Sequence, residues 1–194
     1  MPEATAVDAI DDLWDRFYMA RSLFPRMDAA MAGVRAWEPP EYYAESPYAA
    51  VVMKRPVDLH DVDLNNDVAH WINENLIVRL YAILQVFEVA KADLPDAPGY
   101  DHYRVVRRLR DKIAHGSSRY NAARSEDRDA LERLRRICPG FTPPEEYGGR
   151  FDLSISEVLW PLALGCRDYA AAVCGLSQPL GLLEPAPPGH EWIS

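Results

Sequence analysis

The spacing of apolar residues is the feature that most constrains the fold, because they recur every three or four positions along four segments. This spacing puts them on one face of a helix, and no segment shows the convincing period-two alternation of a strand. The segments run from about Val7 to Val34, Asn65 to Lys91, Tyr100 to His115 and Ser154 to Gly175, with a shorter charged helix over about Glu126 to Ile137. We therefore predict an all-α fold, a small up-and-down bundle of four to five helices.

Prolines mark the expected breaks between these helices. Pro25 should kink or split the first helix, because proline removes a backbone hydrogen bond. Periodicity fails from Trp37 to Asn65, and four further prolines there predict a long irregular connection over residues 38–65. Residues 179–194 are also rich in proline and predict an extended arm that follows a single domain of residues 1–178.

Capping residues suggest where individual helices begin and end. Asn65, Asn66 or Asp67 is expected to cap the second helix. Ser154 followed by Glu157 has the spacing of a capping box for the last helix, which Pro161 should kink. Gly116 and Gly175 are suited to the helix ends that they follow.

Composition narrows the class of protein. Three cysteines without a CxxC pair argue against a disulfide framework and a zinc site. The segment Asp58 to His70 holds several ligand-type side chains but no metal motif, and we interpret it as an acidic, helix-capping loop. With no signal-peptide pattern and no apolar run of membrane-spanning length, we expect a cytoplasmic protein without a metal or cofactor.

Charge is distributed unevenly along the chain. The net charge is −9, yet residues 104–136 hold eleven basic and five acidic residues, a local charge of +6. Such a stretch suits contacts with nucleic-acid phosphates, whereas the alternative is a solvated helix face with internal ion pairs.

The helix from Tyr100 to His115 carries the candidate chemistry. At 100° per residue Arg110 falls near the middle of the apolar face, close to Tyr103 and Val106, while Arg104, Arg108 and Lys112 are expected to point away from it. A buried guanidinium needs a carboxylate, a phosphate or an interface. Asp111 lies one turn before His115 and is expected to orient its imidazole.

These residues carry a family resemblance. The run from Leu109 to Gly116 (LRDKIAHG) resembles the signature of the HEPN superfamily, in which an Arg, a polar residue and a His four to six positions after the Arg close a helix of a small bundle. The motif falls on Arg110, Asp111 and His115. The helices predicted on either side are similar to those of the family.

The resemblance implies both an activity and an assembly. Many members are metal-independent endoribonucleases, often toxins or antiviral-defence effectors, that act as homodimers with the motif helices facing each other. It implies catalytic roles for Arg110, His115 and Asp111, and possible antitoxin or nucleotidyltransferase partners. We assign RNA contacts to four nearby basic residues, Arg104, Arg107, Lys112 and Arg119. The Tyr that some toxins carry two residues after the His is Ser117 here, so control by modification at that position is not supported.

Other readings of the same residues stay open. The spacing alone is not specific, because Arg55 and His60 repeat it in a proline-containing segment without helical periodicity. Arg110 is also compatible with a structural ion pair to Glu88, Glu157 or Asp168, with His115 only ending the helix. The alternative function is a non-catalytic helical binding module for a protein or nucleic-acid partner.

Overall fold

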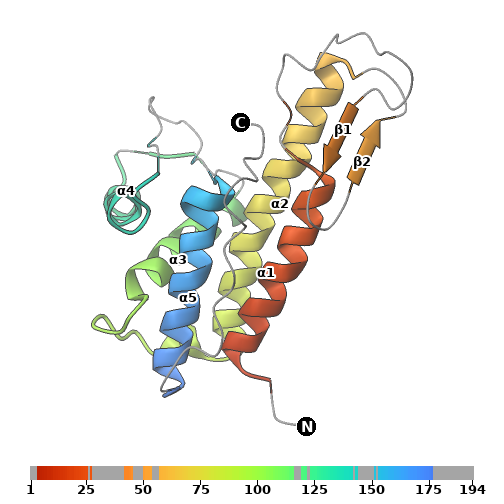
Figure 1. Ribbon diagram of the computed structural model, residues 1–194. Coiled ribbons are helices and arrows are strands. Elements are labelled where there is room, and N and C mark those ends of the chain that lie inside the picture. The colour runs from red at the N-terminus through yellow and green to blue at the C-terminus, as the bar shows by residue number, and fades with distance from the viewer. Residues whose placement is uncertain are drawn as a thin grey trace. The chain divides into compact units, whose positions relative to one another are not determined.

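A computed structural model describes residues 4–25, 27, 42–45, 50–53, 57–115, 119–121, 123–141, 143, 151 and 153–176. Over these ranges the chain forms five α-helices, so the predicted all-α class is confirmed (Figure 1). They are α1 (Ala6–Leu23), α2 (Leu59–Val86), α3 (Tyr100–Ala114), α4 (Ser125–Ile137) and α5 (Trp160–Val173). Two shorter helical turns, η2 (Val89–Lys91) and η3 (Ile155–Leu159), complete them.

The chain divides into two compact units, and the boundaries fall within α1 and α2. The first unit comprises Met1–Trp14 and Asn73–Leu183, and it holds α3, α4 and α5. The second unit comprises Asp15–Ile72 and Glu184–Ser194. The predicted arm at residues 179–194 and the predicted helix segment at residues 28–34 lie outside the described residues.

Side-chain caps begin α1 and α2. In α1 the hydroxyl of Thr5 accepts a hydrogen bond from Asp8 N at 3.2 Å, and the Asp8 carboxylate accepts one from Thr5 N at 2.9 Å. Asp58 and Asp61 form the same reciprocal pair at the start of α2, at 2.8 and 3.2 Å. This satisfies backbone donors that have no partner within a helix. The helix-capping interpretation of the acidic segment is therefore confirmed for these two residues.

The predicted start of the second helix is wrong by several residues. Asn65 and Asn66 lie inside α2, and their amides bind the chain that follows α1. Asn65 donates to Pro25 O at 2.6 Å, while Asn66 accepts from Met27 N at 2.8 Å and donates to Met27 O at 2.9 Å. Asparagine satisfies either a helix end or a distant backbone segment, and sequence alone does not distinguish the two uses.

The connection before α2 contains a small hairpin where the sequence predicted no strand. β1 (Tyr42–Glu45) pairs antiparallel with β2 (Ala50–Met53), with Tyr42 opposite Met53 and Glu45 opposite Ala50. The strands are four residues each, too short for period-two alternation to stand out from chance. The prediction of an entirely irregular connection is therefore wrong at this hairpin.

Two glycines allow α3 and α5 to approach closely. Gly99 precedes α3 with φ 77°, and a Cβ atom there would lie 1.9 Å from Gly165 O. A Cβ atom on Gly165 would in turn lie 2.0 Å from the His102 ring. A larger residue at either position would therefore separate the two helices.

A stack of tyrosines fills the contact between these helices. The rings of Tyr103 and Tyr169 are parallel within 13° and 5.0 Å apart, and Tyr81 of α2 continues the stack at 6.4 Å from Tyr103. Tyr100 packs edge-on against Tyr169 at 5.8 Å. All four residues are buried, and aromatic pairs of this kind contribute beyond the apolar area that they cover.

The tyrosine hydroxyls hold the connection between α2 and α3. Tyr100 donates to the Asp93 carboxylate at 2.8 Å, Tyr103 donates to Ala90 O at 3.0 Å, and Tyr169 accepts from Leu94 N at 3.1 Å. Two residues in this connection, Glu88 and Asp93, have positive φ without being glycine. The three hydrogen bonds help to maintain this uncommon backbone.

The ends of the last helix match the predictions only in part. Ser154 makes no side-chain cap, so the predicted capping box is wrong. The helical segment begins instead with the wide turn η3, in which Leu159 N donates to Ser154 O at 2.9 Å. Pro161 follows in the first turn of α5, where its missing N–H is tolerated. Gly175 ends the helix with φ 67°, and Leu176 N donates to Ala171 O as in a Schellman motif, as expected.

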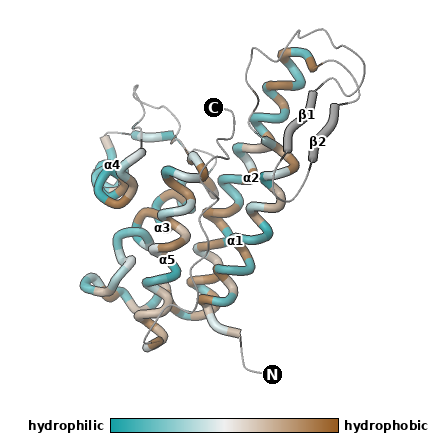
Figure 2. The backbone as a smooth tube through the Cα atoms, in the orientation of Figure 1, coloured by the Kyte–Doolittle hydropathy of each residue, from teal (hydrophilic) through white to brown (hydrophobic). Residues whose placement is uncertain are grey.

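The buried faces agree broadly with the predicted apolar stripes. Hydrophobic and hydrophilic residues alternate along each helix in Figure 2. On α2 the buried side chains include Leu76, Leu80 and Leu84. Helical spacing predicts that Trp71 shares their apolar face, but this residue is 62% exposed. Among the described residues, no helix is long and apolar enough to span a membrane.

We predict that acid destabilises this fold through His102, which packs on Gly165. Burial lowers the pKa of His102 below its ordinary value of 6.5, although the charges of Asp101 and Asp168 oppose this. As the pH falls, the unfolded chain therefore takes up a proton at this histidine before the folded chain does. The contribution of His102 to the free energy of unfolding is complete above pH 6.5, the ordinary value, and decreases as the pH falls below it. Urea unfolding between about pH 7.5 and pH 5.5 measures the loss.

His102→Leu should remove part of this loss, and His60→Leu, at an exposed histidine of α2, should retain all of it. Equal pH dependence in the His102→Leu variant and the unmodified protein would show that another group is responsible.

Candidate functional site

The two ends of the candidate motif lie on the last turns of α3. The helix ends at Ala114, and His115 is its C-cap, with its backbone N–H bonded to Asp111 O at 3.2 Å. The His115 side chain is exposed, and Arg110 lies just over one helical turn earlier. The predicted helix bounds are confirmed here, whereas residues 116–118, including Gly116 and Ser117, lie outside the described residues.

Arg110 lies at the margin of the buried face of α3. Its side chain is 36% exposed, so the prediction that it lies near the middle of the apolar stripe is wrong. The buried face is centred closer to Val105, Val106 and Leu109. The long aliphatic stem of arginine lets the guanidinium reach solvent from such a position.

The Arg110 guanidinium has an aromatic and an acidic neighbour. Its central carbon lies 5.3 Å from the centroid of the Tyr81 ring on α2, a cation–π contact. Its Nη1 donates to the Asp111 carboxylate at 2.9 Å. The carboxylate expected to orient His115 therefore binds Arg110, and Asp111 is the ion-pair partner of Arg110 rather than Glu88, Glu157 or Asp168.

Two further arginines of α3 lie against tyrosines. Arg104 Nη1 donates to the Tyr100 hydroxyl at 3.0 Å, and its guanidinium lies 5.8 Å from the centroid of the same ring. Arg107 is exposed and interacts with the Tyr103 hydroxyl. Partial desolvation opposes the charge of Arg107, but this hydroxyl, Tyr81 and Asp111 together raise its pKa.

Lys112 does not lie on the solvent-facing side where the sequence placed it. Its side chain is 6% exposed and its ammonium group binds Asp127 of α4, which is fully buried. Arg108 Nε donates to the same carboxylate at 2.8 Å, and Asn121 N donates to it at 2.9 Å. The predicted outward direction of Lys112 is wrong, because Asp127 offsets the cost of burying an ammonium group.

These contacts keep Asp127 ionised. Burial alone would raise the pKa of its carboxyl, but hydrogen bonds from Lys112, Arg108 and Asn121 N outweigh burial and lower the pKa. The stabilisation is therefore complete above the ordinary value of 3.8 and is lost only as the pH falls through the lowered value.

Other charges of the basic stretch are paired in the same way. Arg133 and Arg136 of α4 both bind Asp101 of α3, and Arg133 Nε also binds Asp129 at 2.9 Å. Arg119, predicted to contact RNA, is exposed beyond the end of α3. Of the two interpretations of the basic stretch, the helix face with internal ion pairs therefore applies to the side of α3 that packs on α4.

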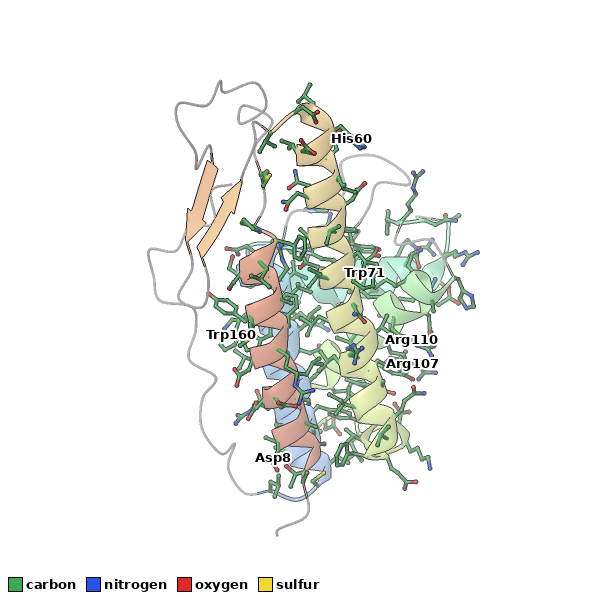
Figure 3. The ribbon with its side chains drawn as sticks, turned by 90° about the vertical axis from the view of Figure 1, so that its right-hand side faces the viewer. Asp8, His60, Trp71, Arg107, Arg110 and Trp160 are labelled. Carbon is green, nitrogen blue, oxygen red and sulfur yellow. The ribbon has the colours of Figure 1, made fainter. Side chains whose placement is uncertain are left out.

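The sequence contained part of the signal for the tyrosine contacts. Tyr100 with Arg104, and Tyr103 with Arg107, are four residues apart, the spacing of neighbours on a helix. Tyr81 and Asp127 carry no such signal, because they reach α3 from other helices. Arg107 and Arg110, both labelled in Figure 3, are three residues apart and are therefore neighbours on the surface of α3.

Comparison of the chain with protein-family models, with curated proteins and with solved structures found no match. Among the described residues, no group of three or more His, Cys, Asp or Glu side chains is placed to hold a metal ion.

We predict that Asp127→Asn lowers the free energy of unfolding by about 3–5 kcal/mol, because it leaves Lys112 and Arg108 without their buried counter-charge. Urea unfolding at neutral pH measures the change. Asp129→Asn on the same helix is the matched control; that side chain is 48% exposed, and the loss should stay below about 1 kcal/mol. Similar losses in the two variants would contradict the importance assigned to Asp127.

Proposed function

We propose that this protein is a metal-independent endoribonuclease of the HEPN type, as the motif resemblance suggests. The observation that carries the proposal is the joint accessibility of two groups at the end of α3, the half-buried guanidinium of Arg110 and the exposed imidazole of His115. An accessible cation and an accessible titratable base are the kinds of side chain that RNA cleavage without a metal requires.

The chemistry assigns one role to each side chain. A histidine removes the proton from a ribose 2′-OH, whose oxygen attacks the adjacent phosphorus. The bond from phosphorus to the 5′-oxygen breaks, and that oxygen takes a proton from an acid, leaving a 2′,3′-cyclic phosphate and a free 5′-OH. Arg110 stabilises the additional negative charge on the phosphorane.

A second proton-transfer group completes this scheme. The motif of one chain contains a single histidine, so we assign the second to His115 of another copy related by two-fold symmetry. In such a homodimer the two α3 helices face each other, with one imidazole acting as base and the other as acid.

A second candidate function is a non-catalytic binding module. It is favoured by the Arg110–Asp111 ion pair, which offsets much of the charge that would act on a phosphorane. In this case the same end of α3 binds a partner without cleaving it.

We expect the purified protein to cleave mixed RNA in EDTA and to leave 2′,3′-cyclic phosphate ends. His115→Ala should reduce the rate by roughly 100- to 10,000-fold, because it removes the general base or acid. The same change should cost no more than about 1 kcal/mol of stability, the usual contribution of a histidine at a helix end.

His60→Ala is the control, since Arg55 and His60 repeat the motif spacing and His60 is also exposed. It should cleave at the unmodified rate. Intact RNA after incubation with the unmodified protein would favour the binding module, and full activity in His115→Ala would place the reaction elsewhere.

We also predict that the protein is a dimer at micromolar concentration. Light scattering or sedimentation measures this directly. Mixing unmodified protein with an excess of inactive His115→Ala should lower the activity per unmodified chain, because a mixed dimer carries only one of the two histidines that the scheme requires. A strictly monomeric, active protein would contradict the composite site.

A further inference from the structure

The basic residues of α3 fall into two groups with different partners. Arg108 and Lys112 are bound to a buried carboxylate of α4, so their charge is used within the fold. Arg104, Arg107 and Arg110 follow one another in steps of about 60° around the adjoining edge of the helix, against Tyr100, Tyr103 and Tyr81 respectively. Arg110 also forms an ion pair with the Asp111 carboxylate, whose charge acts on Arg107 as well.

A tyrosine supports a guanidinium without neutralising it. For Arg104 and Arg110 the ring face attracts the cation and restricts its position, and for Arg107 the Tyr103 hydroxyl does so. The guanidinium keeps N–H donors for another acceptor. The tyrosines themselves are fixed, since their rings are buried in the stack and two of their hydroxyls bind the connection before α3. The edge therefore presents cations at defined positions.

The spacing of these cations suits a single polyanionic strand. Arg104, Arg107 and Arg110 follow one another every three residues, so their backbones span about 9 Å along the helix axis. Residues three apart are neighbours on a helix surface, and the last two of the three are labelled in Figure 3. A guanidinium fork matches the oxygens of a phosphodiester, and a row of them follows a nucleic-acid backbone without reading its bases.

We propose that Arg104, Arg107 and Arg110 form an arginine row that binds successive phosphates of one RNA strand, with the phosphate to be cleaved at Arg110. The choice of RNA as the ligand rests on the proposed function. Lys112, one of the RNA contacts expected from sequence, is excluded from the row because its ammonium group is buried on Asp127.

The test measures binding separately from cleavage. His115→Ala serves as the background, so that a fluorescent single-stranded RNA stays intact while its anisotropy is followed over a series of salt concentrations. The slope of log affinity against log salt reports the number of phosphate contacts, about 0.7 per contact for a single strand.

Arg104→Gln and Arg107→Gln should each weaken binding and each reduce the slope by about 0.7, and the double variant by about twice that amount. Arg135→Gln removes an exposed charge of α4 and is the matched control, with an unchanged slope. Circular dichroism verifies that every variant is folded. Slopes that stay constant in the row variants, or that fall equally in Arg135→Gln, would overturn the arginine row, as would absence of RNA binding.

The experiment distinguishes failure of the arginine row from failure of the nuclease proposal. Slopes that fall as expected, together with an unmodified protein that leaves RNA intact, would support the row and reject the nuclease. Normal cleavage with unchanged slopes would reject the row and retain the nuclease.

Discussion

The ionised side chain of Asp127 is the group on which the packing of α3 depends. This helix carries several basic residues, and it packs on both α4 and α5, so part of its charge must enter the interior. Asp127 accepts hydrogen bonds from Arg108, Lys112 and a backbone N–H, and it is itself fully buried. Without it, the α4 side of α3 would hold two uncompensated cations.

Because Asp127 binds Arg108 and Lys112, the basic residues of α3 that remain accessible are those away from α4. On the α5 side, Gly99 and Gly165 let the helices approach, and the tyrosine rings fill the contact. Arginines at the rim of this stack bind tyrosine faces and hydroxyls. The candidate site is therefore a consequence of how α3 is packed. Arg104 and Arg107 lie against tyrosines, Arg110 lies between Tyr81 and the Asp111 carboxylate, and the charges of Arg108 and Lys112 are balanced by buried Asp127.

Sequence reasoning succeeded where the determinants are local. The bounds of α3 and α4 follow from periodicity, and Gly175 ends α5 because a left-handed residue is needed there. It failed where distant groups decide. The direction of Lys112 depends on Asp127 of another helix, and Asn65 and Asn66 are used by the chain after α1 instead of as caps. Arg110 was placed too close to the centre of the buried face, because burial of Lys112 against α4 moves that centre towards Val105 and Leu109.

The connection between α2 and α3 contains Pro95, Pro98 and Gly99, which are typical of a turn. Hydroxyls of buried tyrosines bind the backbone at Ala90 and Leu94 and the side-chain carboxylate of Asp93. Two of these tyrosines, Tyr100 and Tyr103, also contact arginines of α3. An insertion or deletion here would shift those rings and, with them, the guanidinium positions. The length of this loop is thus coupled to the geometry of the site, and evolutionary change in it is constrained although much of it lies at the surface.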